Sequence, residues 1–150
     1  MSYPLVGLNK IYVFFVFTLC SVSTMAQSYL GVWEQINNDG QKGALVRIEK
    51  SSRANTYVGT IIHVFRYPQD ILCTHCKGDL HNKPVVGMQF MYDMEYKKGE
   101  LVNGKIIDVK TGKTYYTKLS YNKQDDALLM RASVDASGFI GETQVWKRYK

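Results

Sequence analysis

Two cysteines and two histidines crowd into the stretch from Cys73 to His81, CTHCKGDLH, and these residue types can carry three kinds of chemistry. A Cys73–Cys76 disulfide would staple the loop, two thiolates with His81 could bind zinc, and a C-x-x-C pair can catalyse thiol–disulfide exchange. A redox pair needs its first cysteine at a helix N-terminus, where the helix dipole lowers the thiol pKa. Here the pair falls in a loop between predicted strands, so redox chemistry is the least favoured interpretation.

A zinc site at this loop lacks an evident fourth ligand. The spacing C-x2-C-x4-H reproduces the first three ligands of a zinc knuckle, but Val86 stands at the fourth position. His63 or His75 would have to complete the four ligands that structural zinc requires. We therefore predict a disulfide between Cys73 and Cys76 and no bound metal, with zinc binding and redox chemistry as the alternatives.

The first 26 residues indicate the compartment. Lys10 precedes the uncharged run IYVFFVFTLCSVS, and the small residues of TMA follow before Gln27. This order is typical of a secretory signal peptide, so we predict cleavage after Ala26, export to the periplasm or the medium, and no membrane span in the mature chain. The alternatives are an uncleaved span, for which the run is shorter than the roughly 20 residues required, and lipidation of Cys20, which follows Leu19 rather than a small residue. Cleavage would leave one cysteine pair in an oxidising compartment, where disulfides form.

Composition and charge argue against several functions. The chain has 150 residues, 45% hydrophobic and 21% charged, as expected of one globular domain, which we place at residues 27–150. The formal net charge of +6 becomes +5 without Lys10, and the lysines scatter among turns, so no nucleic-acid-binding stripe is evident. No G-x-S-x-G motif is present, and Asp108 in DVKTGK resembles a turn cap. A non-enzymatic role without a cofactor is favoured.

The elements that position the cysteine loop are predicted to be β-strands. Apolar and polar residues alternate with period two, and turn sequences such as NNDG and YKKGE separate the alternating segments. We expect strands near residues 31–36, 44–50, 56–65, 85–95, 100–109, 114–121, 127–134 and 142–149. Eight sequential strands predict an all-β, antiparallel up-and-down barrel, because closure removes exposed edges; a sandwich is the alternative.

Four segments of the chain, GVW at 31–33, NKPVVGM at 82–88, NGKIIDVKTGKTYY at 103–116 and GETQVWKR at 141–148, carry a family resemblance. Together they resemble the domain of unknown function 2147 family of small exported bacterial proteins, and CTHCKGD is similar to a C-x-x-C-K-G-D version in some members. Glu142 stands where members often have arginine. The resemblance implies a lipocalin-like fold and an unassigned function. The G-x-W start also resembles the lipocalin motif, which implies that Trp33 packs at the closed end of the barrel beneath Arg148.

Strand parity predicts where a ligand would lie. If Val46 and Ile48 point inward, alternation turns inward a further set of residues on the last three strands, namely Tyr115, Leu119, Tyr121, Leu128, Met130, Ala132, Val134, Gln144, Trp146 and Arg148. We predict that a small, partly apolar molecule contacts Tyr115, Tyr121, Met130 and Gln144, while Trp33, Trp146 and Arg148 close the barrel. An eight-stranded barrel can equally be filled. The alternatives are therefore an envelope interaction or stress protein without a ligand, and a metal or redox protein that uses the 73–81 loop.

Overall fold

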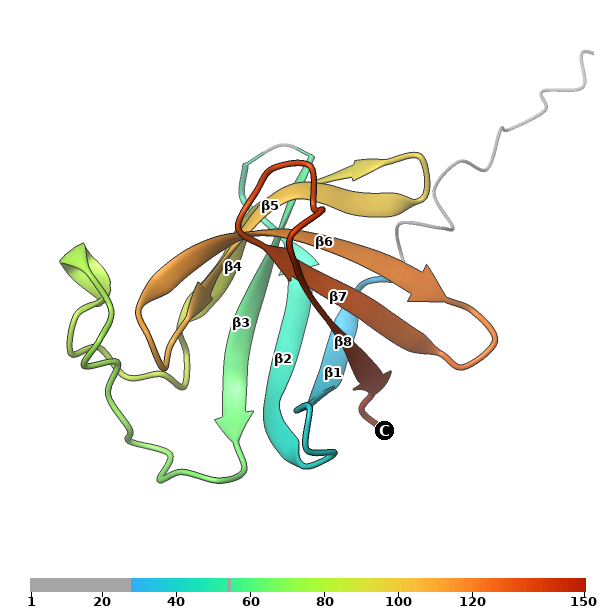
Figure 1. The fold of residues 1–150 in the computed structure, drawn as a ribbon. Coiled ribbons are helices and arrows are strands. Elements are labelled where there is room, and N and C mark those ends of the chain that lie inside the picture. Colours follow the sequence, from blue (N-terminus) through green and yellow to red (C-terminus); the bar gives the residue numbers. More distant parts are fainter. Residues whose placement is uncertain (1–27, 54) are drawn as a thin grey trace, which may run out of the picture.

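A computed structural model of the chain describes residues 28–53 and 55–150, so the predicted signal peptide lies outside the described residues. It contains eight strands, β1 (Gly31–Ile36), β2 (Lys42–Lys50), β3 (Thr56–Val64), β4 (Gln89–Lys97), β5 (Glu100–Asp108), β6 (Lys113–Asn122), β7 (Ala127–Ser133) and β8 (Gly141–Arg148), and a short 3-10 helix, η1 (Gly78–Leu80) (Figure 1). Each strand pairs antiparallel with the next, and β1 pairs with β8 to close the barrel. The predicted all-β up-and-down barrel is confirmed, and the sandwich alternative is wrong.

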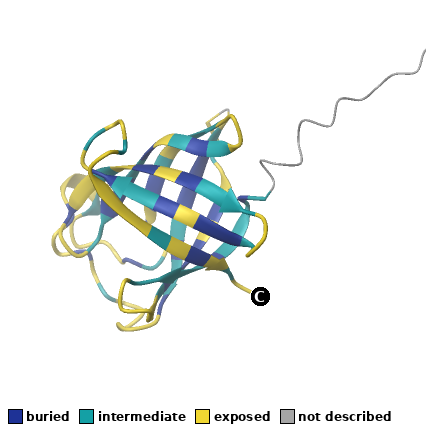
Figure 2. Ribbon diagram, turned by 45° about the vertical axis from the view of Figure 1, so that its right-hand side comes forward, coloured by how far each residue is buried: buried dark blue, intermediate teal, exposed yellow. Residues whose placement is uncertain are grey.

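Burial alternates along much of the sheet as the sequence pattern predicts (Figure 2), although β2 and β3 each contain three consecutive buried residues. On β6, Thr117 and Leu119 are buried while the residue between them, Lys118, is exposed. The alternation fails at the end of β7, where Val134 is 61% exposed and Ser133 is buried. The register continues there, since the Val134 N–H donates to the Ile140 carbonyl at 2.9 Å. Val134 lies beyond the last residue of β7, so the alternation that holds within the strand does not bury it.

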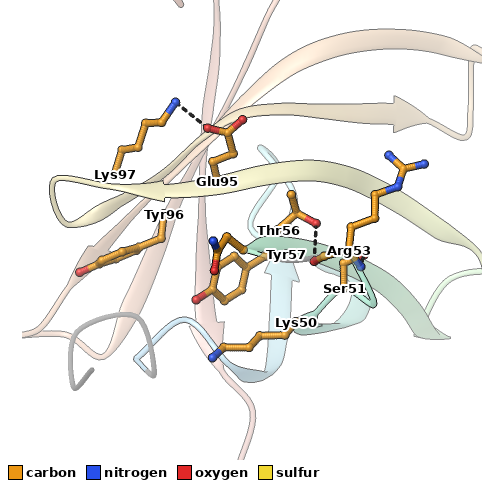
Figure 3. Close-up of a pocket in the computed structure, with 9 residues that line it drawn as sticks. Lys50, Ser51, Arg53, Thr56, Tyr57, Glu95, Tyr96 and Lys97 are labelled. Carbon is orange, nitrogen blue, oxygen red and sulfur yellow. Dashed lines mark hydrogen bonds and ion pairs between the residues drawn. The ribbon is translucent and has the colours of Figure 1, made fainter. Parts of the chain in front are cut away.

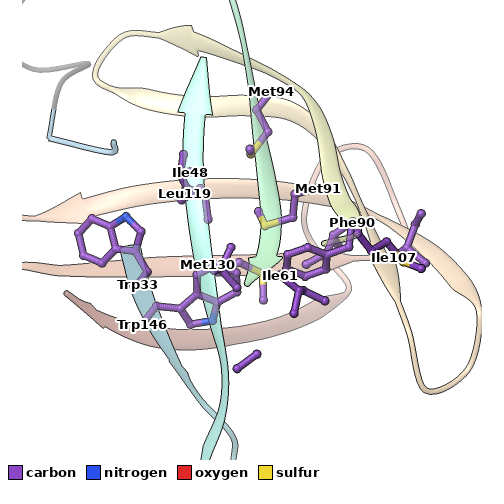
Figure 4. Packing of buried hydrophobic residues seen from close by; sticks show 14 of the residues in the cluster. Trp33, Ile48, Ile61, Phe90, Met91, Met94, Ile107, Leu119, Met130 and Trp146 are labelled. Carbon is purple, nitrogen blue, oxygen red and sulfur yellow. The ribbon is translucent and has the colours of Figure 1, made fainter. Parts of the chain in front are cut away.

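Large apolar side chains fill the interior of the barrel (Figure 4). Those that are less than 2% exposed include Trp33, Trp146, Met91, Met94, Leu101, Leu119 and Leu128. Phe90 stacks on Trp146, with ring centroids 6.5 Å apart and planes 18° from parallel. Gly104 makes room for this packing, because a Cβ there would lie 2.5 Å from Met94 Cγ and 2.9 Å from Thr117 Cγ2. The interior is therefore packed with side chains, as in the core of a globular protein.

Only a few residues of β1 and β8 pair with each other, and they lie near the end of β8. The pairs are Trp33–Arg148, Glu34–Lys147 and Gln35–Trp146. The start of β8, residues 141–145, pairs with β7 but has no register partner on β1. We call the end at Arg148 the closed end and the end at the β7–β8 loop the open end.

Candidate functional site

Arg148 joins three segments at the closed end. Its guanidinium carbon lies 4.1 Å from the centroid of the Trp33 ring. Its Nε donates to both carboxylate oxygens of Asp126, at 2.7 and 2.9 Å, and its terminal nitrogens donate to the carbonyls of Leu30 and Ser28, at 3.1 and 2.8 Å. The hydrogen bonds from Arg148 hold the pKa of Asp126 below its usual range. One side chain thus ties β8 to the β6–β7 turn and to the segment that leads into β1.

A cluster of aromatic rings lies inside the closed end. Tyr29 is fully buried; its hydroxyl donates to the Gly99 carbonyl at 2.7 Å and accepts from the Tyr121 N–H at 3.0 Å. Burial raises the pKa of Tyr29 to about 12. The Tyr121 ring lies 6.3 Å from that of Trp33, and its hydroxyl donates to Asp126 at 3.1 Å. Tyr121, a predicted ligand contact, is therefore part of the closed end.

Half-buried amides lie on the inner faces of β1 and β8, toward the open end. The Oε1 atom of Gln144 accepts hydrogen bonds from Gln35 Nε2 at 3.0 Å and from Trp146 Nε1 at 3.3 Å. Met130 is the direct cross-strand neighbour of Gln144 and of Leu119. The structure thus brings together Met130 and Gln144, two of the four residues predicted to contact a ligand.

The other two predicted contacts lie far apart on one strand. Tyr115 pairs with Ile106 near the start of β6, whereas Tyr121 lies near its end and pairs with Leu128. Six residues separate the two tyrosines, which is about 20 Å along a strand. A single small molecule does not span that distance. Leu119 is in register with Met130 and Gln144; Tyr121 lies two residues from Leu119 toward the closed end, and Tyr115 lies four residues from it toward the open end.

The Cys73–Cys76 disulfide is present, with its Cα atoms 5.4 Å apart and both residues buried, which confirms the predicted pairing. The segment between β3 and β4 that contains it extends along one side of the barrel (Figure 1). The disulfide packs against the β5–β6 turn: Cys73 Sγ lies 3.4 Å from the Val109 carbonyl oxygen, and a Cβ on Gly112 would overlap the carbonyl of His75. The staple therefore holds a side extension of the apolar core in place.

The loop geometry bears on the metal and redox alternatives. His81 Nδ1 lies 3.1 Å from the Cys76 carbonyl oxygen rather than beside a cysteine sulfur. Within residues 28–53 and 55–150, no group of three histidine, cysteine, aspartate or glutamate side chains is arranged to hold a metal ion. The short helix η1 starts after Cys76, so Cys73 does not occupy a helix N-terminus. The absence of bound zinc stays a prediction.

Asp108 caps the β5–β6 turn, as predicted. Its carboxylate accepts the Lys110 N–H at 2.9 Å and the Thr111 hydroxyl at 2.8 Å. These bonds use both oxygens of the carboxylate, which satisfies the turn backbone in the manner typical of aspartate. The β5–β6 turn, fixed by these bonds, packs against the loop that contains the Cys73–Cys76 disulfide.

The β7–β8 loop is an ordered feature that our sequence analysis missed. Asp135 accepts the N–H groups of Phe139 and Ile140, at 3.1 and 2.7 Å, and the hydroxyl of Ser137. Arg131 donates to the carbonyls of Gly138 and Phe139, at 2.6 and 2.9 Å. The signal in the sequence is the aspartate of DASG, a residue that commonly bonds to the backbone just after it.

We expect Asp135 to make the free energy of unfolding depend on pH under acidic conditions. The Ser137 hydroxyl and then the loop N–H groups lower the pKa of Asp135 to about 2. Because the folded pKa is below the unfolded value, the stabilisation is present above about pH 4 and is lost as the pH falls toward 2. Asp135→Asn should lower the melting temperature at pH 6, and the difference from wild type should shrink between pH 4 and 2. Thermal unfolding by circular dichroism checks this, with the exposed Asp70→Asn as control; a constant difference across that range contradicts it.

Two pockets lie on the described residues, and none of the four predicted ligand contacts lines either of them. One, of about 620 Å³, lies between the β2–β3 turn and the end of β4, and Lys50, Tyr57 and Tyr96 are among its lining residues (Figure 3). The other, of about 300 Å³, lies beside the segment before β4, between Leu80 and Gln89. Sequence reasoning identified neither pocket.

A closed eight-stranded antiparallel barrel with an arginine stacked on the first-strand tryptophan is a lipocalin-like protein. Residues 31–148 match the family model described as "Uncharacterized protein conserved in bacteria (DUF2147)", and the chain belongs to this family, as its sequence motifs predicted. Comparison with curated proteins found no match.

The fold is similar to that of protein HP1028 from the human pathogen Helicobacter pylori, which is described as belonging to the lipocalin family. The TM-score is 0.72, the sequences are 22% identical, and the match covers 81% of this chain and 83% of the other. At this identity the likeness concerns the fold alone, and it confirms the expected lipocalin-like architecture. No helix among the described residues is both long and apolar enough to cross a membrane.

Proposed function

We propose that the protein binds a small, partly apolar molecule at the open end of its barrel. The observation that carries this proposal is the half-buried amide pair Gln35 and Gln144 on the inner wall. Gln144 Oε1 accepts two hydrogen bonds, whereas no described residue accepts one from its Nε2. A free donor above an apolar layer is the arrangement that fixes the polar end of a largely hydrophobic ligand.

The side chains beneath the amides can rearrange to admit a ligand. Met91, Met94 and Met130 are at most 3% exposed and contribute to the packed interior. Methionine is unbranched and adapts its rotamers to irregular space, so a methionine-rich interior can repack without moving the strands. In our proposal the ligand displaces the Met130 side chain, accepts a hydrogen bond from Gln144 Nε2, and extends toward Tyr115.

Apolar side chains at the rim support the same proposal. By strand parity, Val134 and Ile140 continue the inner faces of β7 and β8 beyond their last paired residues, and Ile140 is 62% exposed. Their backbones are joined by the Val134 N–H to Ile140 carbonyl bond, which fixes the position of this hairpin end. A firm apolar rim offers an incoming hydrophobic molecule its first contact.

Substitution of Met130 tests the proposal. We expect wild-type protein to bind the uncharged fluorescent probe N-phenyl-1-naphthylamine saturably, and Met130→Trp to weaken binding by about tenfold or more because the larger side chain occupies the site. The matched control is Leu129→Trp, which adds the same ring to the outer face of β7, where Leu129 is exposed.

Circular dichroism must show that the variants keep their β-structure, since overpacking can unfold a core. If Met130→Trp unfolds, Ala132→Phe, at a half-buried position nearer the rim, replaces it. A wild-type protein that binds no probe, or a control that loses binding as strongly as the inner variants, contradicts the proposal.

A second candidate function is partner recognition without a ligand. The observation in its favour is Phe139, which is 86% exposed on a loop held firmly by Asp135 and Arg131. Exposed aromatic side chains on an ordered loop are typical of interaction sites. This function predicts no probe binding, and a native mass spectrum of the protein from its own envelope that shows no small-molecule adduct.

We also propose that residues 27–150 form a single exported domain. The Ser28 carbonyl accepts a hydrogen bond from Arg148, so the chain is tied to the barrel two residues after the predicted cleavage site at Ala26. The buried disulfide suits an oxidising compartment. N-terminal sequencing of the exported protein should begin at Gln27; a start at Met1 or at a lipidated Cys20 contradicts the proposal.

A further inference from the structure

The pocket of about 620 Å³ at the closed end carries an inference of its own. It lies between the end of β2, the β2–β3 turn and the end of β4 (Figure 3). Its volume is in the range of pockets that hold small molecules. Because Gln144 lies toward the other end of the barrel, this site does not rest on the function proposed above.

A tyrosine hydroxyl inside this pocket has no protein partner. Tyr57 is only 4% exposed, yet no described residue hydrogen-bonds its hydroxyl, which points toward the hollow in Figure 3. No fully enclosed side-chain nitrogen or oxygen among the described residues lacks a partner, so the unpartnered Tyr57 hydroxyl is at least partly accessible. Burial, and to a lesser extent Tyr96, raises the pKa of Tyr57, so the group is a neutral donor at neutral pH.

The charges around the pocket leave one cation without a counter-charge. Lys97 pairs with Glu95 at 2.5 Å, and Arg53 pairs with Asp93 at 3.0 Å. Lys50 lines the same pocket, and no described carboxylate lies within 4.0 Å of its ammonium group. The lining therefore offers the unpaired ammonium group of Lys50 and the unpaired hydroxyl of Tyr57, while the other two cations are neutralised by their partners.

We propose that this pocket binds an aromatic carboxylate. One ammonium and one neutral hydroxyl match a single negative charge better than a doubly charged phosphate, which would leave a charge uncompensated. The carboxylate accepts hydrogen bonds from Lys50 and Tyr57, and the flat apolar body of the ligand lies against the exposed part of the Tyr96 ring. Tyr96 is held in place from the other side by Tyr29, whose ring lies 6.3 Å away in an edge-on arrangement.

The test uses 2-naphthoate as the probe, with binding followed by calorimetry and by protein amide chemical shifts. We expect saturable one-to-one binding by the wild type. Lys50→Gln should weaken it by about tenfold or more, and Tyr57→Phe, which keeps the ring, by about five- to tenfold, because each loses a charge-assisted hydrogen bond. The matched control is Lys98→Gln, which removes an exposed charge from the nearby β4–β5 turn and should change affinity less than about twofold.

Two further measurements distinguish binding in this pocket from binding inside the barrel. Uncharged 2-naphthamide should bind at least about tenfold more weakly than 2-naphthoate, because it lacks the charge that Lys50 recognises. Met130→Trp should leave 2-naphthoate binding unchanged, since it alters only the barrel interior. The inference is overturned if wild type shows no saturable binding, if Lys50→Gln and Lys98→Gln weaken binding equally, or if Met130→Trp abolishes binding while Lys50→Gln does not.

Discussion

Replacing Trp146 with alanine is expected to lower the free energy of unfolding by about 3–5 kcal/mol, the usual cost of truncating a buried tryptophan. Trp146 is fully buried, stacks on Phe90 and lies between Leu128 and Gln35 in the sheet. Its removal leaves a void at the centre of the barrel, because strands locked by pairing on both sides cannot collapse into the space. Denaturant titration should show a lower midpoint and an unchanged slope.

The neighbouring residue on the same strand provides the control. Val145 points outward and is 45% exposed, so Val145→Ala should change stability by less than about 0.5 kcal/mol. The void in Trp146→Ala should also accept a small aromatic molecule, since apolar cavities of this kind bind ligands that fit them. Added indole should therefore raise the midpoint of the variant but not of the wild type. A loss below about 1 kcal/mol would mean that the interior is not packed around Trp146.

Much of the fold could be predicted because period-two alternation fixes which face of a strand is buried. The same rule placed Met130 and Gln144 on one wall, and the structure makes them cross-strand neighbours. It failed at Val134, which the alternation places on the inner face but which lies beyond the end of β7 and is 61% exposed. Parity determines the direction of a side chain, whereas burial also requires an opposite wall at the same height.

The pocket at the closed end could not be predicted from the sequence. Its Lys50 and Tyr96 belong to different strands, and their proximity depends on how β3 pairs with β4. That pairing shifts register between Tyr57 and Gly59, and Asp93 on β4 has a positive φ of 57°. A local irregularity of this kind leaves no clear periodic signal, so residues that are individually unremarkable in the sequence meet only in three dimensions.

Replacing Arg148 with alanine is expected to lower the free energy of unfolding by about 3 kcal/mol. Hydrogen bonds to charged groups contribute about 1.5–3 kcal/mol each, and an arginine stacked on an aromatic ring adds about 0.5–2 kcal/mol. These values do not sum, because the Arg148 side chain is 27% exposed and Asp126 remains partly solvated. The loss is nevertheless large, since one substitution releases Asp126, Leu30 and Ser28 and uncovers Trp33.

The pH dependence of the Arg148→Ala variant gives a second readout. In wild type the hydrogen bonds from Arg148 lower the pKa of Asp126, so this stabilisation is present above the unfolded pKa of the carboxyl and is lost as the pH falls through the lowered value. The variant lacks this component, so its stability should fall less steeply with acidification than that of wild type. If the free energy of unfolding of both proteins falls equally steeply with acidification, Arg148 does not stabilise the ionised form of Asp126.

Two further substitutions separate the geometry of Arg148 from its charge. Arg53 also pairs with an aspartate, at 3.0 Å, but is 77% exposed, so Arg53→Ala should cost less than about 0.5 kcal/mol. Arg148→Lys keeps the charge but should recover less than half of the lost stability, because one ammonium cannot reach Asp126 and both carbonyls while also covering the Trp33 ring. If Arg148→Lys is as stable as wild type, charge alone closes the barrel. If Arg148→Ala costs no more than Arg53→Ala, closure does not depend on Arg148, and the pairing of β1 with β8 must be sufficient to hold the closed end.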